Sequence, residues 1–296
     1  MAPSPSRDLD LRKLRYFVAV AEELNFGRAA QRLHIAQPVL SRQIRAFENE
    51  LGVQLFVRGS NGTQLSAAGA QLLQDAKVLL DDAKALQQRL FQAASPSRTV
   101  TVGVMPGLRA TAAAAAFEAA GPGRRAIVRQ VSWAEQVETV RSGDVDVVYA
   151  REVDGNTPGL GSAPLLQEQY FAVLPADDPL ATRPSLTMDD LADRLLLQDP
   201  AILAEVRRTA APGQRWAPPP TAVHTVEDKL EHVAAREGFV VMPRSTTDFY
   251  RRPDVRAVPV EGLPPNRVTL IWNAATDNPV RDEFITAALA CRDETV

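Results

Sequence analysis

The chain has 296 residues, 45% of them hydrophobic and 23% charged, with a formal net charge of −3 and one cysteine, Cys291. This size and composition are typical of a globular protein of two or three domains, and a lone cysteine excludes an intrachain disulfide. No run of about 18 or more apolar residues is present, and the N-terminus lacks a basic segment before an apolar core, so we expect neither a membrane span nor a signal peptide but a cytoplasmic protein.

The charge is unevenly divided along the chain. Residues 1–65 hold nine Lys and Arg against six Asp and Glu, a net charge of +3, whereas the remainder carries −6. A basic head on an acidic body attracts DNA at one end only. A charge of +3 is small, so we expect salt-sensitive binding that needs several heads on one DNA.

Residues 1–8 are rich in Pro and Ser and are predicted to form a disordered leader. Residues 9–65 follow as a head domain. Within it an amphipathic helix is predicted over 11–24, and two shorter helices over 26–33 and 37–51 are joined by a tight turn. The core side of the last helix is marked by four apolar residues at helical spacing: Leu40, Ile44, Phe47 and Leu51.

The opposite side of this helix is polar near its N-terminus. It carries Gln37, Ser41, Arg42 and Arg45. Amide, hydroxyl and guanidinium groups on one helix edge suit insertion into a DNA major groove, although an ordinary α-hairpin with a solvated face has the same pattern. The following segment favours the DNA-binding interpretation, because residues 55–65 are predicted to form a β-hairpin around Asn61-Gly62. Three helices and a hairpin predict a winged helix-turn-helix.

Ser66 is expected to cap a long helix over 66–94. Its apolar residues alternate steps of four and three, as in a coiled-coil seam, at Leu72, Ala76, Leu79, Ala83, Leu86 and Leu90. A helix that joins two domains has little of its own chain to bury leucines on, so we expect dimerisation through this seam; packing on its own domain is the alternative. Two heads held this way would bind an inverted repeat with half-sites about one helical turn, or a multiple, apart.

The segment Ser95-Pro96-Ser97 marks a boundary, and residues 97–296 alternate strands with helices. This alternation predicts parallel sheets covered by helices on both sides, with ligand crevices at the carboxyl ends of the strands, in one α/β domain or two. Strands are expected at 99–104, 126–131, 146–150, 170–174, 195–198, 221–225, 239–242 and 267–272. Helices are expected at 110–120, 133–142, after 189, and at 201–209, 226–236 and 279–292.

Loops at the ends of these strands give the candidate ligand residues, because they and helix N-termini offer backbone N–H groups to anions. These residues are Met105, Pro106, Gly107, Leu108, Arg109, Thr111, Arg151, Gln198, Asp199, His224, Thr225 and Val226. Arg109 or Arg151 could pair with a carboxylate, although each also reads as a surface arginine, and His224 equally as a packing residue. Asp199 would oppose an acid, so the ligand class stays open.

The sequence also bears on functions other than effector-responsive DNA binding. The chain has no G-x-S-x-G, P-loop, G-x-G-x-x-G or H-E-x-x-H motif and only three histidines, so we assign no catalytic residue, metal or cofactor and expect no enzyme. An Asp/Glu dyad in the C-terminal region remains the enzymatic alternative. An effector-independent repressor or architectural protein, whose body only oligomerises, is another.

The run LRYFVAVAEELNFGRAAQRLHIAQPVLSRQIRAFENELGVQLFVR, followed by LSAAGAQLL, closely resembles the DNA-binding domain of LysR-type transcriptional regulators. The resemblance places base and phosphate contacts at Gln37, Pro38, Ser41, Arg42 and, in the wing, Arg58; Arg45 and Arg28 complete the expected DNA-binding set. Ala36 stands where the family usually has a capping Ser or Thr, a loss of about 1 kcal/mol of helix stability. The wing is also poorer in basic residues than usual.

The body resembles the same family in SWAEQVETVRSGDVDVVYAR, EQYFAVLPADDPLA and HVAAREGFVVMP. The resemblance implies a periplasmic-binding-protein-like effector domain with one lobe at 98–167 and 267–292 and another at 168–266. It also implies a small-molecule effector, homo-oligomers that commonly pair dimers into tetramers, and RNA polymerase as a further partner. Closure of two lobes on a ligand would convert binding into rotation.

Overall fold

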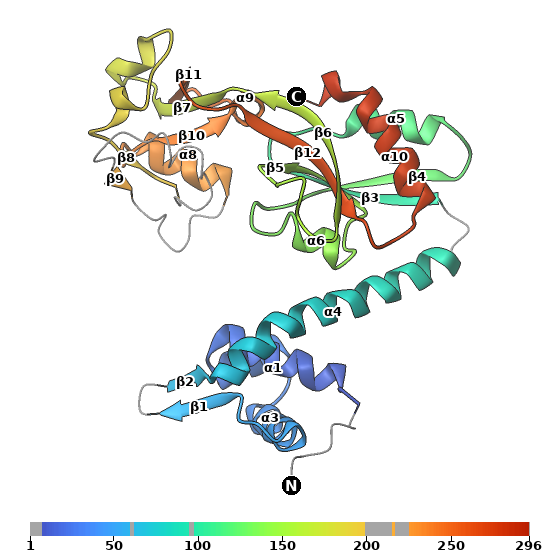
Figure 1. Cartoon of the computed structure of the whole chain (residues 1–296). Coiled ribbons are helices and arrows are strands. Elements are labelled where there is room, and N and C mark those ends of the chain that lie inside the picture. The colour runs from blue at the N-terminus through green and yellow to red at the C-terminus, as the bar shows by residue number, and fades with distance from the viewer. Residues whose placement is uncertain (1–7, 60–61, 95–97, 199–214, 217–224, 296) are drawn as a thin grey trace. The chain divides into compact units, whose positions relative to one another are not determined.

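The structure is a computed structural model that describes residues 8–59, 62–94, 98–198, 215–216 and 225–295. The chain divides into two compact units, Met1–Phe91 and Gln92–Val296 (Figure 1). The first unit is helical with one hairpin, and the second is α/β. No helix in these described ranges is long and apolar enough to cross a membrane.

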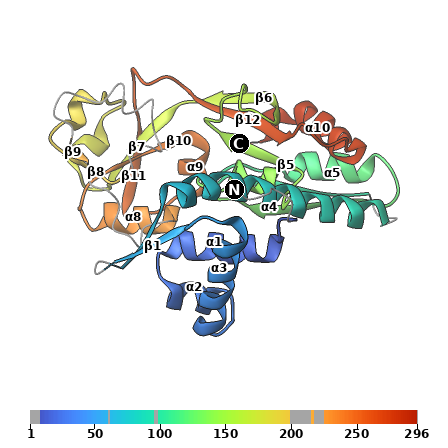
Figure 2. The same ribbon diagram turned by 60° about the horizontal axis from the view of Figure 1, so that its bottom comes forward.

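The first unit is a winged helix-turn-helix, as predicted (Figure 2). Its core is centred on Phe17, whose ring lies 6.5 Å from that of Phe47 and 5.5 Å from that of Phe56, so helices and wing share one aromatic cluster. The hairpin strands pair antiparallel from Phe56 with Leu65 to Gly59 with Gly62. The elements are α1 (Leu11–Glu23), α2 (Phe26–Arg32), α3 (Gln37–Leu51), β1 (Phe56–Gly59), β2 (Gly62–Leu65) and α4 (Ala67–Ala94).

The starts of the helices follow their capping residues. Asn25 caps α2 by accepting hydrogen bonds from two backbone N–H groups, at 2.8 and 3.1 Å. Ala36, as expected, gives α3 no side-chain cap. Ser66 Oγ accepts from the Gly69 N–H at 3.0 Å, which confirms the predicted cap of α4.

Helix α4 divides its apolar residues between two surroundings. Leu72 and Ala76 pack into the core of their own head. Ala76 was predicted to lie in the dimer seam, but it is only 1% exposed and is therefore not available to a partner. Further along, Leu79 is 40%, Leu86 52% and Leu90 63% exposed. The first turns therefore match the alternative of packing on the chain's own domain, because the head lies against them, and the later turns leave their leucines uncovered.

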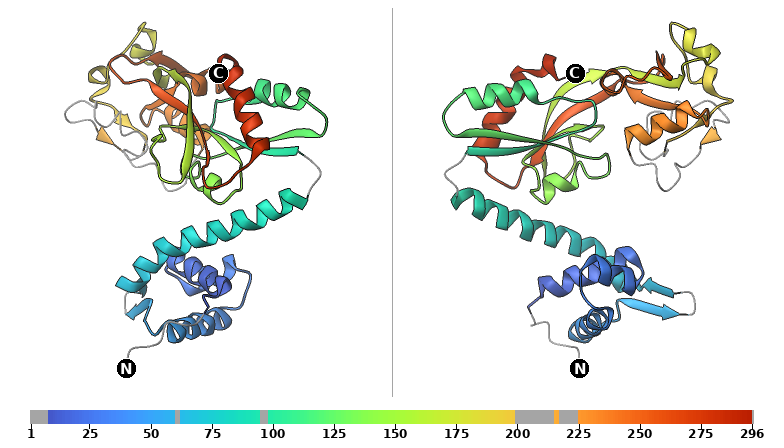
Figure 3. Two further views of the ribbon diagram at one scale, coloured as in Figure 1. Left: turned by 45° about the vertical axis from the view of Figure 1, so that its right-hand side comes forward. Right: turned by 180° about the vertical axis from the view of Figure 1, so that it is seen from behind.

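The second unit contains a five-stranded sheet in the order β4-β3-β5-β12-β6. Its two faces are covered separately: Tyr149 faces the core with α5 and α10, and Val148 faces the core with α6 (Figure 3). We call this sheet and its helices the first lobe. Its elements are β3 (Arg98–Val104), α5 (Thr111–Ala119), β4 (Arg124–Gln130), α6 (Glu138–Arg141), β5 (Val147–Arg151), β6 (Leu160–Glu168), β12 (Asn266–Asn273) and α10 (Pro279–Ala290).

The second lobe is built on a three-stranded sheet in the order β10-β7-β11. Helix α8 covers one face of it, where Leu230 and Val233 pack with Val173 and Val240. The elements are β7 (Tyr170–Pro175), β8 (Leu195–Leu196), β9 (Arg215–Trp216), α8 (Val226–Ala234), β10 (Val240–Pro243), α9 (Arg244–Phe249) and β11 (Val255–Pro259), with short 3-10 helices at Pro179–Thr182, Asp189–Leu191 and Arg292–Glu294.

The expectation of parallel sheets was wrong for much of this unit. Only β3 pairs in parallel with β4 and β5 in the first sheet, whereas β12 runs antiparallel to β5 and β6, and β7 runs antiparallel to both its neighbours. The chain passes between the lobes after β6 and before β12, and these strands enter the first sheet without a crossover helix. Strands β6 and β11 and helix α9 were not predicted, and the expected helix at 133–142 is reduced to α6. The elements expected at 201–209 and 221–225 lie outside the described residues.

Candidate DNA-reading face and effector cavity

Helix α3 keeps its apolar and polar residues on separate sides. Leu40 and Ile44 are fully buried, and Phe47 is 2% exposed. The predicted reading residues share the other side: Gln37, Pro38, Arg42 and Arg45 are exposed, and Ser41 is partly buried. We call this set the reading face.

Two further arginines assigned to DNA are placed differently. Arg28 donates from Nε to the Glu23 carboxylate at 3.0 Å and from Nη2 to the Glu23 carbonyl at 2.6 Å. Its charge is therefore shared with an acid of its own head, which weakens it as a phosphate contact. Arg58 lies in β1 opposite Thr63, and its side chain is outside the described part.

Two carboxylates that the sequence did not single out hold the reading face in position. Glu48, on α3, accepts from the Leu55 and Phe56 N–H groups at 2.8 and 3.1 Å and so fixes the start of the wing against α3. Glu22 pairs with Arg32 and with Lys77 of α4 at 2.7 and 2.8 Å. These ion pairs lower the pKa of Glu22 against the effect of its burial. They connect α1 to α2 and to the long helix.

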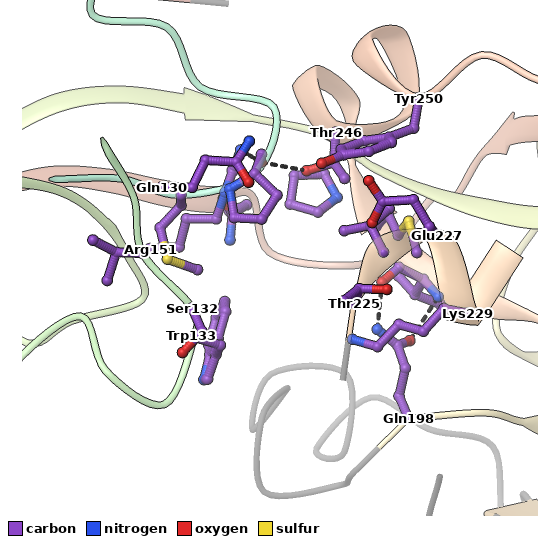
Figure 4. Close-up of a pocket in the computed structure, with 18 of the residues that line it drawn as sticks. Gln130, Ser132, Trp133, Arg151, Gln198, Thr225, Glu227, Lys229, Thr246 and Tyr250 are labelled. Atoms are coloured by element: carbon purple, nitrogen blue, oxygen red, sulfur yellow. Dashed lines mark hydrogen bonds between the residues drawn. The ribbon is translucent and has the colours of Figure 1, made fainter. Parts of the chain in front are cut away.

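In the second unit a cavity of about 380 Å³ lies between the lobes (Figure 4). This volume is within the range of small-molecule sites, roughly 300–1,000 Å³. The first lobe contributes Met105, Pro106, Gln130, Val131, Ser132, Trp133, Glu135, Arg151 and Asn266. The second lobe contributes Gln198, Thr225, Val226, Glu227, Lys229, Val241, Met242, Pro243, Thr246 and Tyr250.

Arg151 lines the cavity, but its guanidinium is already paired. It forms a buried ion pair with Glu168, the two side chains being 3% and 6% exposed. It also donates to Asn266 Oδ1 at 2.6 Å, to Ser245 Oγ at 2.6 Å and to the Pro106 carbonyl at 3.4 Å. Ser245 belongs to α9 of the second lobe and Arg151 to the first. The arginine expected to receive an anion therefore joins the two lobes instead.

Gln198 and Thr225 are likewise engaged with the protein. The Gln198 amide donates to the Val241 carbonyl at 2.9 Å and accepts from the Val241 N–H at 2.7 Å, so both its ends are used. Thr225 and Asp228 form a reciprocal cap at the start of α8. Gln198, Thr225 and Val226 line the cavity, as predicted. The side chains of Gln198 and Thr225, however, form hydrogen bonds within the protein.

The first loop only partly lines the cavity. Met105 and Pro106 line it, whereas Leu108 packs in the core of the first lobe. Arg109 and Thr111 are exposed and do not line the cavity. Gly107 has φ +87°, and a Cβ there would lie 2.6 Å from the Thr246 Cα. The glycine thus permits close contact between the lobes. Asp199 and His224 lie outside the described residues.

Several lining residues were missed, and some had a signal. Gln130 and Val131 end the second predicted strand, and Ser132 and Trp133 follow it, so the reasoning applied to the ends of other strands would have included them. Glu227 and Lys229 lie in the first turns of α8, where only Thr225 at its start and Val226 were named as candidates. Tyr250 follows α9, which nothing in the sequence indicated. Across the described chain, no cluster of His, Cys, Asp and Glu is arranged to hold a metal ion.

A winged helix-turn-helix with an exposed polar helix face, on one chain with a two-lobed α/β unit enclosing a cavity, defines the class of ligand-responsive DNA-binding regulators. Residues 11–70 match the model "Bacterial regulatory helix-turn-helix protein, lysR family", and residues 93–290 match "LysR substrate binding domain". The chain belongs to the LysR family of transcriptional regulators.

Two relatives match almost the whole chain. The "Probable cat1 operon transcriptional activator" of Acinetobacter lwoffii is 30% identical over 91% of this chain and 91% of its own length. The HTH-type transcriptional regulator TdfR of Cupriavidus pinatubonensis is 33% identical over 95% of this chain and 98% of its own. For two Escherichia coli relatives, the uncharacterized regulator YnfL and the Hca operon activator HcaR, the match spans less than two thirds of their length, 64% and 62%.

Solved structures show the same fold. CbnR, described as a LysR family transcriptional regulator, superimposes with a TM-score of 0.60 at 24% identity, over 95% of this chain and 98% of that one. CbnR complexed with its target DNA gives a TM-score of 0.58 at 23% identity, over 95% of this chain and 99% of that one.

Proposed function

We propose that the protein is a transcriptional regulator that binds an interrupted inverted repeat as a homo-oligomer and responds to a small molecule in the cavity between the lobes. On this proposal residues 9–65 are the DNA-binding domain, 66–94 the linker helix and 97–296 the effector domain, which covers both lobes (98–167 with 267–292, and 168–266). The protein acts in the cytoplasm on double-stranded DNA and has no catalytic activity. While bound to its operator, it contacts RNA polymerase.

The reading face of α3 is the observation that carries the proposal. Gln37, Ser41 and Arg42 offer amide, hydroxyl and guanidinium groups to base edges and phosphates, while the opposite side of the helix is fixed in the core. The test is a footprint on the DNA upstream of the protein's own gene, with and without candidate metabolites. We expect protection of two half-sites about one helical turn, or a multiple, apart, and a pattern that changes with the effector. Equal affinity for every duplex at low salt would refute the proposal.

Dimerisation through α4 is supported by the exposed leucines of its later turns. Changing both Leu79 and Leu86 to Asp should convert the protein to monomers. Each subunit would then bury two unpaired carboxylates in the dimer seam. Sedimentation velocity measures the change, and Gln74→Asp, on the exposed opposite side of α4, is the matched control. A dimer that persists in the double variant would mean that the subunits associate elsewhere. The same measurement on the unaltered protein distinguishes a dimer from a pair of dimers.

An effector-independent regulator is the second candidate, favoured by the internal pairing of Arg151 and Gln198, which leaves two expected ligand contacts occupied. Calorimetric titration against a metabolite panel separates the two functions. A ligand that binds in the cavity and alters the footprint supports the effector-responsive regulator; a footprint insensitive to every ligand that binds supports the other.

A further inference from the structure

Lys229 stands apart from the other charged groups of the cavity. It lies on α8, and its side chain reaches from the second lobe toward the cavity on the side opposite Trp133 (Figure 4). Its amino group makes no hydrogen bond or ion pair with any described residue. Burial lowers the pKa of Lys229, because an ammonium group loses part of its hydration there.

The other polar groups on the cavity wall are already paired. Arg151 is neutralised by Glu168, and Gln198 is held at both ends by the backbone of β10. Ser132 donates to Glu135 at 2.6 Å. A ligand that enters the cavity therefore meets Lys229 as the cation that still lacks a partner among the described residues. Buried charges are stable when they are paired, so this position calls for an anionic group.

Apolar side chains form part of the cavity wall. In the first lobe, Trp133 supplies a flat aromatic surface and Met105 is 3% exposed; Met242, 4% exposed, lines the cavity from the second lobe. Aromatic rings and thioethers bury large apolar area, and methionine adapts to the shape of its neighbour. These side chains suit the uncharged body of a ligand, and Arg151, the other cation of the lining, is already paired with Glu168.

The rim of the cavity carries acids. Tyr250 is hydrogen-bonded to the Gln130 amide of the first lobe (Figure 4), and the Glu227 carboxylate lies near its hydroxyl. Burial raises the pKa of Tyr250, and the neighbouring Glu227 charge raises it further. Glu135 is a second acid on this rim. A negative charge at the outer end of a ligand would be repelled by these carboxylates.

We propose that the effector is a monoanionic organic acid: its acidic group pairs with Lys229, its apolar body packs on Trp133 and the two methionines, and its outer end is uncharged. The inference rests on the proposed function in taking the cavity as the effector site. It assigns the charge recognition to Lys229 rather than to Arg109 or Arg151, and it disfavours dianions.

The test compares acids with neutral molecules of the same shape on the full-length protein. Isothermal titration uses benzoate, cinnamate and indole-3-acetate, the three corresponding amides, and the dianion terephthalate. At least one acid should bind tenfold or more tighter than its amide, and terephthalate should bind more weakly than benzoate. Lys229→Met should reduce that acid to the affinity of its amide. Lys84→Met, which removes an exposed lysine from α4, should keep the full discrimination.

A second measurement needs no ligand. Because Lys229 is partly buried and has no partner among the described residues, Lys229→Met should raise the thermal midpoint of the ligand-free protein, while Lys84→Met leaves it unchanged. The proposal is overturned if an amide binds as tightly as its acid, if the discrimination survives in Lys229→Met, if the dianion binds tightest, or if Lys229→Met lowers the midpoint. If no probe binds, the melting result decides. Failure of the unaltered protein to recognise any operator would instead count against the regulatory function.

Discussion

Arg42→Ala should abolish sequence-specific operator binding while leaving the fold and the oligomeric state intact. Arg42 is exposed on the reading face, and its guanidinium has no partner among the described residues. A good bidentate contact to a base is worth about 1–3 kcal/mol of discrimination, and a dimer loses two such contacts, about 2–6 kcal/mol in all. Fluorescence anisotropy with the footprinted operator and a scrambled duplex, at one fixed salt concentration, measures the loss.

The control is Arg15→Ala, which removes the same charge from an exposed position on α1. This variant should weaken binding to both duplexes alike, if at all, because a change in the overall charge of the head carries no sequence information. Circular dichroism and sedimentation of Arg42→Ala should match the unaltered protein. An Arg42→Ala protein that still prefers its operator as strongly as before would show that the bases are read elsewhere.

Arg151→Met should destabilise the effector unit by about 3–5 kcal/mol, because Glu168 would keep its charge in a buried site without a counterion. The pair is almost wholly buried, and the arginine also holds Asn266 and Ser245, so one substitution breaks contacts to both lobes. Urea unfolding followed by intrinsic fluorescence measures the change.

The double variant Arg151→Met with Glu168→Gln is the informative partner. Removing the uncompensated charge should recover much of the lost stability, since replacing both members of a buried pair is often close to neutral. A single variant that costs no more than an exposed arginine such as Arg183→Met would mean that water reaches the pair. A double variant no more stable than the single one would place the cost in the contacts to Asn266 and Ser245 instead.

The fold of the head could be predicted from local sequence patterns. Helices, hairpin and reading face depend on local patterns, namely the spacing of Leu40, Ile44 and Phe47, the capping by Ser66, and a compact hairpin. Such patterns act over a few residues, so one periodicity specifies both the core side and the polar side of α3. Helices α8 and α10 and the strands next to them were predicted for the same reason.

The strand directions in the second unit, and the partners of the polar residues in the cavity, depend on contacts between residues that are far apart in the chain. Strand β6 lies beside β12, about a hundred residues later in the chain, and no local pattern states that pairing. Arg151 looked available in the sequence because Glu168, Ser245 and Asn266 are distant along the chain. Lys229 was not singled out in the sequence, because its place in the cavity wall depends on how the two lobes pack. Charge availability depends on which groups packing brings within a few ångströms, and the order of residues does not encode that directly.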